Sequence, residues 1–168
     1  MKAEGKAVDS YSFNSLADEI CERLGDKEWA KKVYKKAEGK AEDYSDFRDL
    51  ADNIHEKLGD KVWARKVYKK AEKKAEDSSS LSSLAYCLFE LGDKEWATRL
   101  YKKAEGKDYY VEFITSSDFS GLANSIHENL GDKEWAKNMY EKALEVAEYN
   151  DDSEYEIETI KEALEELG

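Results

Sequence analysis

The residue types best suited to metal or redox chemistry are few in this chain and far apart. Two histidines, His55 and His127, and two cysteines, Cys21 and Cys87, are the complete supply. A protein zinc site needs three or four such ligands that converge on one ion. These four residues fall in four different copies of a repeated sequence, so we expect half-exposed helix residues that do not meet. The sequence predicts no metal site, no disulfide framework and no cofactor.

Carboxylates are abundant but form no distinct acid–base pair. The chain contains no phosphate-binding glycine loop, no Gly-x-Ser-x-Gly and no metalloprotease motif. We therefore expect that the protein is not an enzyme. Its net charge is −12, the acidity is concentrated in residues 141–168, and no basic stripe is available for a phosphate backbone. Neither a signal peptide nor an apolar run of roughly 20 residues is present. The sequence thus predicts a cytoplasmic protein that binds neither nucleic acid nor a membrane.

A seven-residue motif, Leu-Gly-Asp-Lys-Glu-Trp-Ala, organises the chain. It occurs three times, and a fourth copy differs only at Val62. The copies begin 34, 33 and 39 residues apart, at Leu24, Leu58, Leu91 and Leu130. A period in this range is typical of stacked helical repeats. Within the motif, the glycine suits the left-handed residue that ends a helix, and the aspartate suits the N-cap of the next helix.

Each repeat is expected to consist of two helices, because apolar residues recur at helical spacing on both sides of the motif. The expected first helices cover residues 12–24, 46–58, 80–91 and 118–130. The expected second helices cover 27–42, 61–76, 94–107 and 133–148, and a closing helix covers 153–167. The predicted boundaries within a single repeat domain, 1–168, are repeat 1 at 10–43, repeat 2 at 44–77, repeat 3 at 78–108, an insertion at 109–116, repeat 4 at 117–149 and a capping helix at 152–168.

These elements resemble the tetratricopeptide repeat. Repeat 3 has the family spacing in Leu84-Ala85, Gly92 and Ala97-x3-Tyr101. Repeats 1, 2 and 4 have the same elements with one extra residue before the glycine. The resemblance covers about residues 12–148 and implies an all-α, right-handed solenoid of helix-turn-helix repeats with a C-terminal capping helix. It also implies an interaction scaffold or adaptor, whose first helices line a concave groove that binds a protein or peptide segment.

The non-packing positions of the first helices are the expected binding surface. A glutamate persists there in all four repeats while its neighbours change, which indicates an acidic surface with Tyr86 and Phe89 as an apolar anchor. Such a surface favours a neutral or basic protein or peptide as partner. The predicted groove residues are Asp18, Glu22, Arg48, Asp52, His55, Tyr86, Phe89, Asn124 and His127.

Two other features invite a functional interpretation. One tryptophan recurs in every motif, at Trp29, Trp63, Trp96 and Trp135, and this sameness favours packing over ligand binding. The insertion at 109–116 is aromatic and β-branched, which favours local packing onto repeats 3 and 4, although insertions in repeat arrays often contribute to a binding face.

Two alternatives to a peptide-binding scaffold remain open. Both ends of the chain resemble cut repeats, so the protein could be either a monomer or a weak end-to-end oligomer that stacks through its end faces. The near identity of the second helices also fits a designed or consensus-like repeat scaffold with no ligand.

Overall fold

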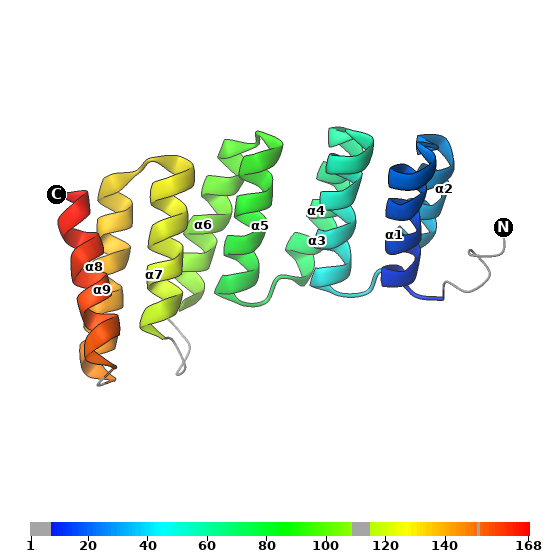
Figure 1. Ribbon diagram of the computed structural model, residues 1–168. Helices are drawn as coiled ribbons and strands as arrows, with labels where there is room; N and C mark the ends of the chain where they lie inside the picture. Colours follow the sequence, from blue (N-terminus) through cyan, green and yellow to red (C-terminus); the bar gives the residue numbers. More distant parts are fainter. Residues whose placement is uncertain (1–7, 109–114, 151) are drawn as a thin grey trace. The chain divides into compact units, whose positions relative to one another are not determined.

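A computed structural model describes residues 8–108, 115–150 and 152–168. In these ranges all regular secondary structure is helical. The chain divides into two compact units, Met1–Glu76 and Asp77–Gly168. Within each unit consecutive helices pair as hairpins, with the first helices in one layer and the second helices in another (Figure 1). The predicted all-α fold of helix-turn-helix repeats is confirmed.

The first unit contains two hairpins. Its helices are α1 (Ser10–Glu19), α2 (Lys27–Glu38), α3 (Tyr44–Asn53) and α4 (Lys61–Lys74). The second unit contains two further hairpins and one more helix, which packs against α8. Its helices are α5 (Ser78–Leu91), α6 (Lys94–Asp108), α7 (Ser116–Ser125), α8 (Lys133–Tyr149) and α9 (Glu154–Leu167).

The first helices begin two residues earlier than expected, because a polar N-cap precedes each of them. Asp9, Asp43 and Asp77 each accept a backbone N–H from the residue three positions later, at 2.8, 2.9 and 2.6 Å. Thr115 does the same for α7, in a capping box with Asp118. A side-chain oxygen at this position satisfies one of the free N–H groups of the first turn. The prediction started each helix near its first large apolar residue and overlooked these caps.

The second helices begin where the sequence predicts. The motif aspartates Asp26, Asp60 and Asp132 cap α2, α4 and α8 by accepting the backbone N–H of the following tryptophan. The preceding glycines adopt the left-handed conformation, with φ of 70° at Gly59. Two helices end earlier than expected: α2 at Glu38 rather than 42, and α4 at Lys74 rather than 76.

The extra residue of repeats 1, 2 and 4 is accommodated in a π-helical turn at the end of the first helix. These turns are η1 (Ile20–Leu24), η2 (Ile54–Leu58) and η3 (Ile126–Leu130). Repeat 3 lacks the extra residue, and α5 is α-helical throughout. A π turn absorbs one inserted residue without breaking the helix. The core residues on both sides therefore keep their places.

Alanines and a tyrosine recur in the buried core of every hairpin, together with larger apolar side chains such as Phe13 and Val33. Ala17 on α1 and Ala30 and Ala37 on α2 are completely buried, which lets the two helices approach closely. Tyr34 is also completely buried, and a large aromatic side chain contributes much of the area removed from water. The interior of this hairpin thus combines one tyrosine with alanines and larger apolar side chains.

Two of the tryptophans, Trp63 and Trp135, join consecutive second helices. In unit 1, the indole Nε1 of Trp63 donates to the Glu38 carboxylate at 2.9 Å, and Lys70 pairs with the same carboxylate at 2.8 Å. In unit 2 the same arrangement recurs at 2.9 and 2.8 Å between Trp135, Glu105 and Lys142. The prediction that the tryptophans pack is confirmed at Trp96, which is 3% exposed, whereas Trp63 and Trp135 are half-buried.

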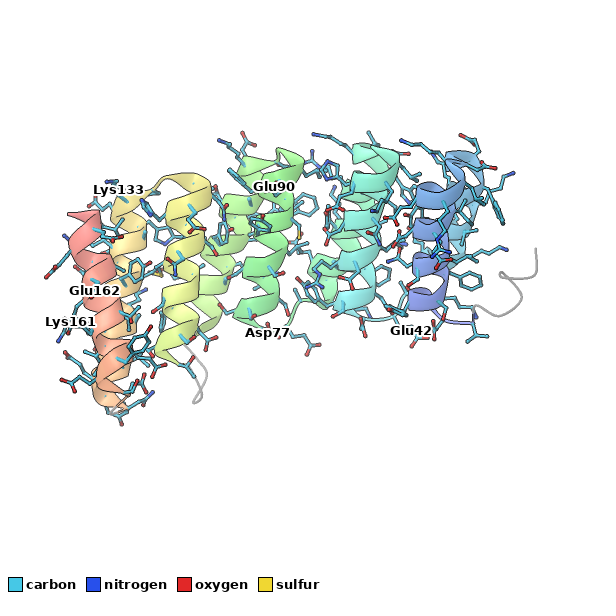
Figure 2. The ribbon with its side chains drawn as sticks, in the orientation of Figure 1. Glu42, Asp77, Glu90, Lys133, Lys161 and Glu162 are labelled. Atoms are coloured by element: carbon cyan, nitrogen blue, oxygen red, sulfur yellow. The ribbon has the colours of Figure 1, made fainter. Side chains whose placement is uncertain are left out.

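Some predicted segments fall outside the described residues. Of the insertion at 109–116, only Thr115 and Ser116 are described, where they cap and begin α7. The start of the chain, 1–7, also lies outside them. The last helix, α9, is acidic and largely exposed, and Lys161 and Glu162 lie on it (Figure 2). Asp77 and Glu90 lie at the two ends of α5 (Figure 2).

Candidate functional site

Three of the predicted groove residues accept a hydrogen bond from a buried tyrosine of their own hairpin. In each case the tyrosine lies on the second helix and the acceptor on the first. The pairs, all at 2.5 Å, are Tyr34–Asp18, Tyr68–Asp52 and Tyr140–Asn124. These side chains satisfy a buried hydroxyl, which would otherwise cost the desolvation of an unpaired polar group. Their first role is therefore structural.

Side-chain bonds also connect the first helices of unit 1. Asn53 on α3 donates to the second oxygen of Asp18 on α1 at 3.0 Å. Burial raises the pKa of Asp18, and the hydrogen bond from Tyr34 opposes this rise. Near the π turns, Lys57 pairs with Glu22 at 2.6 Å and lowers the pKa of that carboxyl. The space between α1 and α3 is thus bridged at two levels.

Arg48 and the two histidines lie on three different elements. The Arg48 guanidinium contacts the neighbouring Asp49 carboxylate at 2.5 and 2.9 Å and lies 5.7 Å from the centroid of the Tyr44 ring. His55 is half-buried on η2 of unit 1, and His127 is exposed on η3 of unit 2. Among the described residues no group of three or more His, Cys, Asp or Glu side chains could hold a metal ion.

Repeat 3 departs from this plan at one position. Tyr86 stands where repeats 1, 2 and 4 have the acceptor for the buried tyrosine. The Tyr101 hydroxyl instead accepts from the Asn129 amide of the next repeat at 3.1 Å. Tyr86 is left 50% exposed. Its predicted partner Phe89 is half-buried, with the Lys94 ammonium 5.2 Å from its ring centroid. Tyr86 is therefore the exposed member of the predicted pair.

An open groove runs between α5 and α7, the first helices of repeats 3 and 4. It has a volume of about 330 Å³ and contains Tyr86 from the predicted list. The walls consist mainly of six serines from the two helices, together with Tyr86, Asp118, Gly121 and Leu122. The Asp118 carboxylate accepts bonds from the backbone N–H and hydroxyl of Thr115 at 3.1 and 2.8 Å. The groove thus offers hydroxyl groups and one aromatic ring.

Small residues keep this groove open. Gly121 and Ser125 on α7 occupy the sequence positions that Asp49 and Asn53 occupy on α3. In unit 1 the larger Asn53 side chain bridges to Asp18, whereas a Cβ added at Gly121 would meet no atom within 4 Å. The serine-rich stretches 78–83 and 116–120 were the sequence signal for this site. The predicted groove residues include none of these serines, because charged and aromatic side chains were favoured.

Comparison with known proteins finds a family model that matches part of the chain. Residues 122–150, which run from α7 through η3 and α8, match the family model of the tetratricopeptide repeat. The chain is a tetratricopeptide-like helical repeat protein. Tetratricopeptide repeats are in general interaction scaffolds that bind proteins or peptides, rather than enzymes.

Two further comparisons concern curated sequences and solved structures. No curated protein sequence matches the chain. Among solved structures, the chain is similar to a "Circular tandem repeat protein with novel repeat topology and enhanced subunit contact surfaces", at 19% identity and a TM-score of 0.18. The match covers 94% of this chain and 32% of that one, so this chain spans about a third of the length of that protein.

No helix in the described part of this tetratricopeptide-like chain is both long enough and apolar enough to cross a membrane.

Proposed function

We propose that this tetratricopeptide-like protein is a non-enzymatic scaffold that binds a segment of another protein, and that the groove between α5 and α7 is its main contact. The observation that carries the proposal is the exposed Tyr86 ring in the wall of an open groove. Exposed aromatic side chains in a depression are frequent centres of binding energy, because a partner can bury them fully. The exposed His127, on the π turn η3 that follows α7, is a candidate peripheral contact.

The predicted groove residues of unit 1 contribute differently to this proposal. Asp18 already bonds α1 to α3, Glu22 pairs with Lys57 between η1 and η2, and Asp52 accepts from Tyr68. Any partner that used these side chains would have to share them with an existing hydrogen bond. We therefore assign them to the rigidity of the scaffold and place recognition in unit 2.

The test is a selection of random peptides on the immobilised protein, compared with a Tyr86→Ala variant. Truncation of a hot-spot aromatic costs about 2 kcal/mol or more, which is roughly a thirtyfold loss of affinity. A matched control is Tyr155→Ala, because Tyr155 is 81% exposed on α9, outside the groove lining. We expect the control to bind the selected peptides as the parent does. Equal binding by the Tyr86→Ala variant would contradict the proposal.

A further inference from the structure

The outer side of α4, the second helix of repeat 2, is basic and contains an exposed apolar side chain. Four exposed residues share this side at helical spacing: Val62, Lys66, Lys69 and Lys73. Val62 is 69% exposed. The buried residues of α4, among them Ala64 and Ala71, lie on the opposite side of the helix. We call Val62 and the three lysines the basic face.

The basic face departs from the repeat plan at two positions. The residues that correspond to Val62 in the other repeats are all glutamates: Glu28, Glu95 and Glu134. The residues that correspond to Lys73 are Gly39, Gly106 and Glu145. No acidic residue therefore interrupts this side of α4. Val62 and Lys73 are both exposed, so packing inside the repeat does not require either departure.

The neighbouring second helix, α2, adds to the positive charge of this side of unit 1. The hydrogen bond from Trp63 to Glu38 joins α4 to α2. Together the two helices contain twelve Lys or Arg and three Glu, a net charge of +9. The first helices α1 and α3 contain five acidic residues and one arginine. The acidic α3 separates the two basic helices in the sequence, and the fold brings them together.

The outer side of α9 is the counterpart of the basic face. Four exposed residues share it at helical spacing: Tyr155, Glu158, Glu162 and Glu166. Tyr155 is 81% exposed. The buried residues of α9, Ile160 and Leu167, lie on the opposite side of this helix, which packs against α8. The helix contains six Glu and one Lys, a net charge of −5. We call Tyr155 and the three glutamates the acidic face.

The two faces match position by position. Val62 and Tyr155 are each the second residue of their helix. The lysines follow Val62 by four, seven and eleven residues, and the glutamates follow Tyr155 by three, seven and eleven. At about 1.5 Å per residue, both faces are about 17 Å long. When the two helices run in the same direction, Val62 meets the Tyr155 ring and each lysine meets a glutamate.

We propose that the basic face of one copy of this chain binds the acidic face of a second copy. An exposed ion pair contributes little by itself, so the contact depends on three Lys–Glu pairs together with the apolar contact between Val62 and Tyr155. Each chain has a net charge of −12. At about 0.15 M salt, charges more than about 8 Å apart are largely screened, so the charges in contact outweigh the net charge. Neither face lines the groove between α5 and α7, so this contact is independent of the function proposed above.

The experiment measures the average mass of the full chain by sedimentation equilibrium over a range of concentrations at about 0.15 M salt. We expect self-association that weakens at least about fivefold when the salt is raised to about 0.5 M. The variants Lys66→Glu/Lys73→Glu and Glu158→Lys/Glu166→Lys should each weaken it at least about tenfold, because like charges then face one another. Lys and Glu have similar helix propensities, so both variants should keep the circular dichroism spectrum of the parent.

An equimolar mixture of the two variants is the decisive sample. Each unchanged face then meets an unchanged partner, and each reversed face meets a reversed partner. We expect the mixture to associate within about threefold of the parent. A matched control is Lys103→Glu/Lys133→Glu, which makes the same change in net charge at exposed positions on α6 and α8. This control should associate as the parent does.

A single substitution tests the apolar contact without reversing a lysine. Val62→Glu restores the residue that the other three repeats have at this position, so the helix should fold normally. It places a carboxylate opposite the acidic face and removes the apolar contact. We expect it to weaken self-association at least about fivefold.

Three results would overturn the inference. The first is a parent chain that stays monomeric up to about 1 mM, and the second is a mixture of the two reversed variants that remains monomeric. The third concerns the other occupants of a basic surface, for which a single-stranded oligonucleotide and phosphatidylserine vesicles are the probes. Binding of either probe by a monomeric parent, and its loss in Lys66→Glu/Lys73→Glu, would assign the basic face to phosphate groups instead.

Discussion

Replacing Tyr34 by phenylalanine would remove one hydroxyl from the interior of unit 1 and leave the ring in place. The ring is completely buried, and its hydroxyl donates to the Asp18 carboxylate at 2.5 Å. A hydrogen bond to a charged group contributes about 1.5–3 kcal/mol. Because Asp18 is half-buried, water can partly replace the lost donor. We therefore expect the free energy of unfolding to fall by about 1.5 kcal/mol, at the low end of that range.

The measurement is urea unfolding followed by circular dichroism. With a slope of about 2 kcal/mol per molar urea, the midpoint should fall by roughly 0.75 M while the slope stays unchanged. Tyr101→Phe provides a comparison within the same repeat plan, since the Tyr101 hydroxyl is bonded to a neutral amide. Its expected cost is only about 0.5–1.5 kcal/mol. Tyr11→Phe is the control, because Tyr11 is 76% exposed.

A double-mutant cycle shows whether the hydrogen bond itself is responsible. Asp18→Ala removes the acceptor, so the loss from Tyr34→Phe should shrink by about 1 kcal/mol in that background. Strict additivity of the two substitutions would refute the reasoning. A Tyr34→Phe effect no larger than that of Tyr11→Phe would refute it as well.

Two further predictions concern the pKa of Asp18 and the contact between Glu38 and Trp63. Burial raises the pKa of Asp18 above its ordinary value of 3.8, so folding favours the protonated form. The stability that this carboxyl contributes is fully present when the pH is below the pKa of Asp18 in the unfolded chain. It is lost as the pH rises through the pKa of Asp18 in the folded protein. We therefore expect the parent to lose stability relative to the Asp18→Asn variant as the pH rises above about 4. The measurement is the free energy of unfolding in urea as a function of pH. Parallel pH dependences for the two proteins would contradict this expectation. Glu38→Ala removes the acceptor of the Trp63 indole and should lower the free energy of unfolding by about 1–2 kcal/mol, measured by thermal unfolding. The matched control Glu28→Ala, at an exposed position, should change stability by less than about 0.5 kcal/mol. Equal effects of the two substitutions would count against the contact.

Local features of the fold were predictable from the sequence because the interactions that produce them are local. The motif glycine ends the first helix and the motif aspartate caps the second, through bonds between residues three positions apart. Periodic apolar residues define the buried face of each helix. The repetition of tryptophan indicated packing, since a residue with the same neighbours in every repeat keeps the same contacts. The early starts of the first helices were missed only because their caps lie outside the repeated motif.

The groove residues were harder to predict because a groove belongs to two helices at once. Asp18 looks like a solvated residue when α1 is considered alone. Its two hydrogen-bond partners lie 16 and 35 residues away, on different helices. No periodic pattern reports whether such a position meets a tyrosine, an amide or open space. The charged residues on the first helices were therefore interpreted as a free surface, although several of them hold the hairpins together.

The sequence by itself determined that this chain forms repeated helix pairs, where most of the helices lie and which residues fill the hairpins. The period of the motif and the spacing of its apolar residues contain that information. Only the tertiary structure decided that α5 and α7 leave an open groove between them. That outcome depends on the sizes of facing side chains. Gly121 and Ser125 are small and leave a space open between α5 and α7. Between α1 and α3, a hydrogen bond from Asn53 to Asp18 bridges the corresponding space. Helix periodicity reports which face is buried, but the width of a groove is set by residues that are distant in sequence and adjacent in space.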